Sequence, residues 1–202
     1  MPLAPQPKSA RAWQRMLSGR RLDLLDPSPL DVEIEDIAHG LARVARWNGQ
    51  TAGSDIFSVA QHSLLVEAIG GCLDPDLTNP GRLALLLHDA PEYVIGDIIS
   101  PFKAVIGDAY RAVETRLLAA IHVRFGRPVE PSPAVRRLAK RADRIAAFLE
   151  ATRLAGFSRD EAIRFFGRPA SLPAEIDAFL TPWPVERSKA RYAARINDLW
   201  SG

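Results

Sequence analysis

The sequence has almost no cysteine and no long hydrophobic run, and each absence excludes a class of protein. Because Cys72 is the single cysteine among 202 residues, the chain cannot form an internal disulfide or a cysteine-based zinc site. No segment approaches the roughly 20 apolar residues of a membrane-spanning helix, and the N-terminal residues lack the apolar centre of a secretory signal. These absences predict a cytoplasmic protein that does not interact with a membrane.

The sequence also lacks a concentration of charge of one sign. It has 26 Lys and Arg against 24 Asp and Glu, a net charge of +2, and its basic residues are scattered along the chain. A surface that binds nucleic acid needs clustered positive charge, so we expect a small-molecule partner and no nucleic acid. With 47% hydrophobic and 25% charged residues, the composition suits one globular domain with a sizeable core.

Helical periodicity is the main pattern that is present. Apolar residues recur at intervals of three and four in several segments, and helix-start signals precede three of them: Ser58 with Gln61, Ser132 with Pro133, and Ser158 with Glu161. The first helix is expected to begin near Glu33 and to end near Arg46. We predict an all-α fold, a single helical bundle with at most a short strand pair in the N-terminal arm. Residues 1–30 would form the tail and arm, and residues 31–202 the helical core.

The stretch from Leu83 to Lys103 carries the strongest functional signal. It begins as an apolar helix and places three ionisable side chains, His88, Asp89 and Glu92, at the end of that helix. On helical geometry His88 and Glu92 lie one turn apart and Asp89 lies between them, so the three can converge at one point. Taken alone, a His-Asp pair is more often a hydrogen-bonded core histidine beside an exposed carboxylate. The rest of the chain must therefore decide its meaning.

Four ionisable residues lie on or beside apolar faces of three predicted helices: His62, His88, Asp89 and Asp143. Two imidazoles and two carboxylates are a ligand set for a divalent transition metal such as Mn, Fe, Co, Ni or Zn, whereas an all-oxygen set would favour Mg or Ca. Four protein ligands leave positions for water and a substrate oxygen on an octahedral ion, as metal-assisted hydrolysis requires. The pattern therefore predicts one divalent transition-metal ion.

The order His62, then His88-Asp89, then Asp143 resembles the HD-domain metal-dependent phosphohydrolase superfamily. Three runs are similar, more narrowly, to bacterial HD-domain 5′-nucleotidases, which remove phosphate from deoxyribonucleoside monophosphates: QHSLLVE, LLHDAPEYVIGDIISPFK and ADRIAAFLEA. The resemblance covers residues 34–156. It includes neither the N-terminal arm nor the last quarter of the chain.

The resemblance implies a role for each matching residue. It implies that the metal ligands are His62, His88, Asp89 and Asp143. It implies that an acidic pair, Glu92 and Asp97, handles the attacking water and the leaving oxygen, and that Arg46 and Trp47 bind the substrate. Lys103, by default a surface lysine, is a further candidate for neutralising charge on the phosphoryl group. A guanidinium fits a phosphate bidentately, and an aromatic face packs against a nucleoside. The resemblance also implies a homodimer or a larger homo-oligomer.

The expected function is release of phosphate from (deoxy)nucleoside 5′-monophosphates by metal-activated water. The loop between Trp47 and His62 differs from those nucleotidases in length and content, and it would border the nucleoside. A deoxynucleoside triphosphate triphosphohydrolase of the same fold is therefore an alternative. A non-catalytic nucleotide-binding regulator is a second alternative, although such a sensor would not need Glu92 and Asp97.

Overall fold

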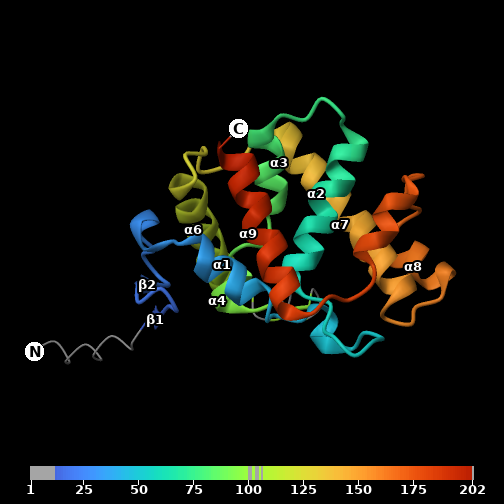
Figure 1. The fold of residues 1–202 in the computed structure, drawn as a ribbon, viewed down its shortest axis with the longest axis horizontal. Coiled ribbons are helices and arrows are strands. Elements are labelled where there is room, and N and C mark those ends of the chain that lie inside the picture. The colour runs from blue at the N-terminus through green and yellow to red at the C-terminus, as the bar shows by residue number, and fades with distance from the viewer. Residues whose placement is uncertain (1–11, 100–101, 103–104, 106, 202) are drawn as a thin grey trace, which may run out of the picture.

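The computed structural model describes residues 12–99, 102, 105 and 107–201. These residues form a helical bundle with one small antiparallel hairpin (Figure 1), which confirms the predicted all-α class. The hairpin pairs β1 (Trp13–Arg15) with β2 (Arg21–Asp23), so the N-terminal arm does contain a short strand pair. The start of the predicted tail, residues 1–11, and Lys103 lie outside the described residues.

The helices follow in chain order, with η denoting a 3-10 helix: η1 (Pro29–Asp31), α1 (Ile34–Leu41), η2 (Arg46–Gly49), α2 (Val59–Leu73), α3 (Asn79–Leu86), α4 (Glu92–Ile95), α6 (Asp108–Arg124), α7 (Pro133–Arg153), α8 (Arg159–Phe166), η3 (Ala174–Phe179) and α9 (Val185–Ser201). In Figure 1, α9 crosses the middle of the bundle between α1 and α2, and α8 and the hairpin lie at opposite ends. None of the helices in the described part of the chain has the length and hydrophobicity needed to cross a membrane.

Helix α2 is the centre of the bundle. It packs against α7, α3, α9 and η3, and eleven of its fifteen residues are buried. A helix covered on several sides must be apolar on several sides, and α2 is accordingly apolar around most of its circumference. Fully buried side chains such as Leu65 and Ile69 each contribute about 1.5–3 kcal/mol to folding. Two of the polar residues buried near its start, Gln61 and His62, have large polar side chains that need specific partners.

The predicted helix starts are confirmed. In each case the serine hydroxyl accepts a hydrogen bond from the backbone N–H three residues later: Ser58 for α2, Ser132 for α7 and Ser158 for α8. The reciprocal half of the capping box is present only in α8 among these three. The amide of Gln61 instead donates to the carbonyls of Phe179 and Thr181, at 2.7 Å each, and joins α2 to the C-terminal segment.

The first helix is shorter than predicted. It ends at Leu41 instead of reaching Arg46, because the chain turns and pairs Ala45 with Ser58 in an antiparallel bridge. The backbone N–H of Arg46 donates to the carbonyl of Phe57 at 2.8 Å. This pairing brings Arg46 and the residue after it beside the beginning of α2.

The central helix was also predicted too long. Helix α3 ends at Leu86, His88 and Asp89 lie in a turn, and Glu92 is the first residue of the separate short helix α4. Pro91 explains the break, because proline has no N–H to donate and its ring clashes with the preceding helical turn. His88 and Asp89 are therefore turn residues, and both contact His62 on α2.

Candidate metal centre

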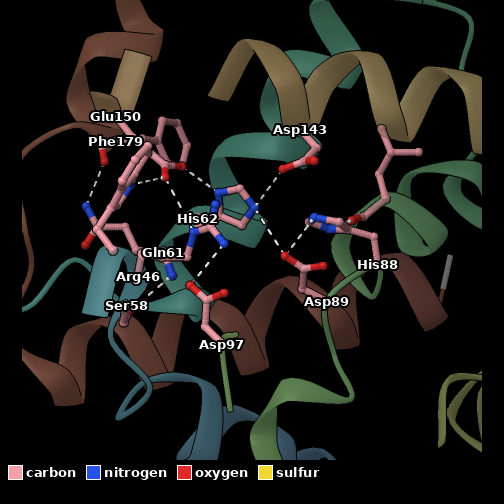
Figure 2. Close-up of polar contacts among 12 residues, drawn as sticks. Arg46, Ser58, Gln61, His62, His88, Asp89, Asp97, Asp143, Glu150 and Phe179 are labelled. Carbon is pink, nitrogen blue, oxygen red and sulfur yellow. Dashed lines mark hydrogen bonds and ion pairs between the residues drawn. The ribbon is translucent and has the colours of Figure 1, made fainter. Parts of the chain in front are cut away.

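His62 is fully buried on α2 and lies between carboxylates on both sides of its ring (Figure 2). Its Nδ1 donates to Oε1 of Glu150 at 2.5 Å. Because an ionised carboxylate can only accept, the Nδ1 proton is fixed and Nε2 is the nitrogen that faces the site. Nε2 lies 3.4 Å from Oδ2 of Asp89 and 3.3 Å from Oδ1 of Asp143.

His88 presents the same nitrogen to the same volume. Its Nδ1 donates to the carbonyl of Leu85 at 2.9 Å, so its Nε2 is directed toward the site and lies 3.2 Å from Oδ2 of Asp89. The ring centroids of His62 and His88 are 5.3 Å apart. A turn and a helix that are distant in the sequence thus place two imidazole Nε2 atoms side by side.

The donor set fits a metal ion. One ligand atom from each of His62, His88 and Asp143 lies within 4.8 Å of the other two, a group that could hold a metal. Both Nε2 atoms are buried, and among the described residues their polar neighbours are carboxylate oxygens of Asp89 and Asp143 at 3.2–3.4 Å, without a well-aligned hydrogen bond. Nitrogen and oxygen atoms gathered in this way suit coordination of one cation. The Asp143 side chain is 41% exposed, so the group opens to solvent. Asp89 contacts both imidazoles, and its role as a fourth ligand stays a prediction.

The electrostatics of the group favour a cation. Burial and Arg46 lower the pKa of His62, but the carboxylates of Glu150, Asp143 and Asp89 outweigh them and raise it well above its ordinary value of 6.5. Burial raises the pKa of Asp89, but His88 and His62 outweigh burial and hold this pKa well below its usual range. The carboxylates are therefore ionised, and their combined field attracts positive charge to the space between the imidazoles.

Glu150 is a site residue that sequence reasoning missed. It is fully buried on α7, seven residues after Asp143 and hence on the same face two turns later. Besides His62, it accepts the indole N–H of Trp47 at 2.9 Å and lies 3.4 Å from Nε of Arg46. Burial raises the pKa of Glu150, but the charges of His62 and Arg46 outweigh burial and lower it to about 2. A glutamate within the apolar stripe of α7 was the available signal.

Arg46 and Trp47 occupy a strained turn. Trp47 and Asn48 have φ angles of 57° and 50°, in the left-handed region that costs about 1–2 kcal/mol for a residue other than glycine. Arg46 is 14% exposed and donates from Nη1 to Oδ2 of Asp97 at 3.1 Å. It thus links Asp97 to Glu150, and its contact with a phosphate stays a prediction.

A pocket of about 670 Å³ opens beside the metal-ligand group, within the range of about 300–1,000 Å³ that is typical of ligand sites. Glu92 is 1% exposed at the start of α4, and it lines this pocket. Six of the predicted site residues line it: Arg46, Trp47, Asp89, Glu92, Asp97 and Asp143. The structure therefore brings the predicted acidic pair and the predicted Arg-Trp pair to one opening.

Comparison with known proteins identifies two relatives. The uncharacterized protein RCAP_rcc00048 of Rhodobacter capsulatus is 62% identical over 160 residues, which cover 79% of this chain and 81% of that protein. The uncharacterized protein YfdR of Escherichia coli is 31% identical over 106 residues, which cover 52% of this chain and 54% of that protein. No protein-family model matches the chain.

Proposed function

We propose that this chain, which belongs to the family of the Rhodobacter capsulatus protein RCAP_rcc00048, is a metal-dependent phosphohydrolase of the HD-domain superfamily. Its substrates are (deoxy)nucleoside 5′-monophosphates, and its products are inorganic phosphate and a nucleoside. The observation that carries this proposal is the convergence of three side chains, His62, His88 and Asp143, at the edge of a pocket that also contains Glu92 and Asp97.

The ligand residues suit a divalent ion of the transition series. His62 and His88 would hold it through Nε2 and Asp143 through a carboxylate oxygen, with Asp89 beside both imidazoles. A divalent ion bound there supplies Lewis-acid chemistry, which polarises a phosphoryl oxygen and activates water. The carboxylates and imidazoles of the chain determine where that chemistry takes place.

The acidic residues of the pocket transfer the proton that the reaction moves. Hydrolysis forms a new P–O bond from water and breaks the bond between phosphorus and the 5′ oxygen, and the proton lost by water must reach that oxygen. In this proposal Glu92 accepts the proton from water, and its burial in the pocket wall supports that role. Asp97, which Arg46 holds in place, is the second carboxylate near the leaving oxygen.

Positive side chains at the same pocket suit a phosphate dianion. Lys140 and Arg144 flank Asp143 on the exposed side of α7 and line the pocket with Arg46. Arg46 shares its charge with two carboxylates, so Lys140 and Arg144 supply the more accessible positive charge. Such groups neutralise charge on a transferring phosphoryl group.

Product analysis tests this function directly. Metal-loaded protein is incubated with dAMP and, separately, with dATP, and the phosphorus products are quantified. We expect inorganic phosphate and deoxyadenosine from dAMP. Triphosphate released from dATP, with no turnover of dAMP, would support the triphosphohydrolase alternative. Nucleotide binding without any turnover would support the regulator.

Two substitutions separate metal binding from chemistry. Asp89→Ala removes a charged group that contacts both imidazoles, so we expect loss of both bound metal and activity. Glu92→Ala should retain the metal and lose rate by about 10²–10⁴-fold, the usual contribution of a general acid or base. Normal turnover by Glu92→Ala would show that the proton acceptor is another residue.

A further inference from the structure

Four aromatic side chains form a continuous surface along one part of the pocket, and we name it the aromatic wall: Trp47, Phe157, Phe165 and Phe166. The Trp47 ring lies 5.6 Å from that of Phe157 and 6.1 Å from that of Phe166, centroid to centroid. Phe165 lies 6.2 Å from Phe157 and 6.3 Å from Phe166. Each ring therefore contacts at least two others, and the wall joins η2 to the segment that contains α8.

One ring of the wall, Phe165, is exposed, whereas Trp47, Phe157 and Phe166 are partly buried and pack against the core around Phe148. Phe165 is 69% exposed, whereas Phe57, Phe125 and Phe148 are almost completely buried in the core. Burial of a phenylalanine side chain stabilises a fold by about 1.5–3 kcal/mol, and an exposed ring does not contribute this energy. An exposed ring at the rim of a pocket therefore indicates contact with a ligand more readily than a contribution to folding.

The wall is connected to the candidate metal centre through one carboxylate. Oε2 of Glu150 accepts the Trp47 indole N–H at 2.9 Å, and Oε1 of the same residue accepts Nδ1 of His62. The aromatic wall and the metal-ligand group are thus two parts of one pocket. A ligand that combines an anionic group with a flat apolar group would contact both the cationic side chains and the aromatic wall of this pocket.

We propose that the aromatic wall binds the nucleobase of the substrate by stacking, with Phe165 as the principal contact. This inference rests on the proposed phosphohydrolase function, because the metal and the cations at the pocket fix the phosphate of the same molecule. A nucleotide is a small molecule that carries a dianion at one end and an aromatic ring at the other. Stacking on aromatic side chains accepts any base, since every base has a π-face.

The wall also predicts low selectivity among bases. Three of its members are phenylalanines, which have no hydrogen-bonding group. The only such group in the wall, the Trp47 indole N–H, is already bonded to Glu150. The four rings can therefore stack on a base but cannot form hydrogen bonds to its edge. We expect purine and pyrimidine nucleotides to have KM values within about tenfold of one another.

Substitution of Phe165 tests the inference with a substrate pair that differs only in the base. For Phe165→Ala we expect KM for dAMP to rise by about 5- to 50-fold, from the energy of base stacking, and KM for deoxyribose 5-phosphate to stay within twofold. Leu30→Ala, which truncates an equally exposed apolar residue outside the pocket, is the matched control and should change neither KM. Equal effects of Phe165→Ala on both substrates, or no effect on either, would overturn the inference.

A binding measurement separates failure of this inference from failure of the proposed function. Deoxyadenosine, which has no phosphate to hydrolyse, is titrated into the metal-loaded wild type and into Phe165→Ala by calorimetry. Weaker binding to the variant supports the aromatic wall even if no phosphate ester is hydrolysed. Phosphate release from dAMP with unchanged deoxyadenosine binding would leave the function standing and the wall refuted. If Phe165→Ala changes the oligomeric state but neither the affinity for deoxyadenosine nor the KM for dAMP, the wall contacts a second copy of the chain. That result would also refute the inference.

Discussion

At the scale of single residues, the site depends on how α7 holds both nitrogens of one imidazole. Asp143 lies at 3.3 Å from Nε2 of His62, and Glu150 lies at 2.5 Å from Nδ1. The two carboxylates are seven residues apart, a spacing that returns to the same helical face. Glu150 thereby fixes which nitrogen is presented to a metal, and the same carboxylate anchors Trp47.

We predict that Glu150→Gln lowers metal affinity by about 10- to 100-fold, the usual effect of losing a partner of a ligating histidine. The amide has one acceptor oxygen for two donors, the imidazole N–H and the indole N–H, so its NH₂ group must face a donor. Competition with a chromophoric chelator measures the affinity. The control is Glu67→Gln, a buried glutamate on α2 that pairs with Arg82 and Arg195. Equal metal affinities for the two variants would contradict the role of Glu150.

At the scale of elements, the position of Glu92 depends on a close approach between α1 and α4. A Cβ atom added at Gly40 on α1 would lie 2.7 Å from the carbonyl oxygen of Tyr93 and 2.8 Å from its Cβ. Both atoms belong to Tyr93 on α4, so the clash can be relieved only if α4, which begins at Glu92, shifts away from α1. Glycine at position 40 therefore lets α4 lie directly against α1.

We predict that Gly40→Ala lowers the free energy of unfolding by about 1–2 kcal/mol. Overpacking costs about 1–3 kcal/mol, which exceeds the gain of up to about 1 kcal/mol from alanine in a helix. Chemical denaturation measures the change. The matched control is Gly71→Ala on α2, where the added Cβ would meet the guanidinium of Arg82, which can move aside. Wild-type stability of Gly40→Ala would show that the two helices separate without cost.

The short helix α8 brings two rings of the aromatic wall to the pocket, and a capping box fixes its start. Ser158 accepts the backbone N–H of Glu161, while the Glu161 carboxylate accepts both the hydroxyl and the backbone N–H of Ser158. The side-chain and backbone hydrogen bonds from Ser158 lower the pKa of Glu161 below its ordinary value of 4.5. Protonation of this carboxyl therefore weakens the helix start.

We predict that the stability contributed by this box is complete above pH 4.5 and is lost as the pH falls through the lower pKa of the folded state. The difference in thermal midpoint between the wild type and Glu161→Gln should therefore be largest above pH 4.5 and shrink at lower pH. Thermal unfolding monitored by circular dichroism across this range measures it. A difference that is constant with pH would show that the Glu161 charge does not stabilise α8.

At the scale of the whole molecule, much of the architecture was predictable because local rules and the fold agree. Periodic apolar residues predicted the helices, and serine caps predicted the starts of α2, α7 and α8. The central stretch was less predictable, since its apolar periodicity continues past Leu86 although Pro91 forces a turn. Within the candidate site, the ligand-type residues on apolar helical faces, together with the resemblance that their order carries, predicted that His62, His88, Asp89 and Asp143 converge, and ligand atoms of His62, His88 and Asp143 do lie together.

The parts that could not be predicted are contacts between distant segments. Glu150 has no motif of its own, and its importance depends on three donors that approach it from α2 and η2. The aromatic wall likewise requires Phe165 to lie near Trp47, more than a hundred residues earlier in the chain. Periodicity reports which side of a helix is buried, but it does not report what the helix packs against.

The most direct test of the central proposal is anomalous diffraction from a crystal of the protein grown with Mn²⁺. We predict one strong anomalous peak bound by Nε2 of His62, Nε2 of His88 and a carboxylate oxygen of Asp143. A crystal of Asp143→Asn grown under the same conditions should show a peak of much lower occupancy at this position. A wild-type map with no peak at these three residues, or with its peak elsewhere on the molecule, would contradict the metal centre and the hydrolase proposed from it.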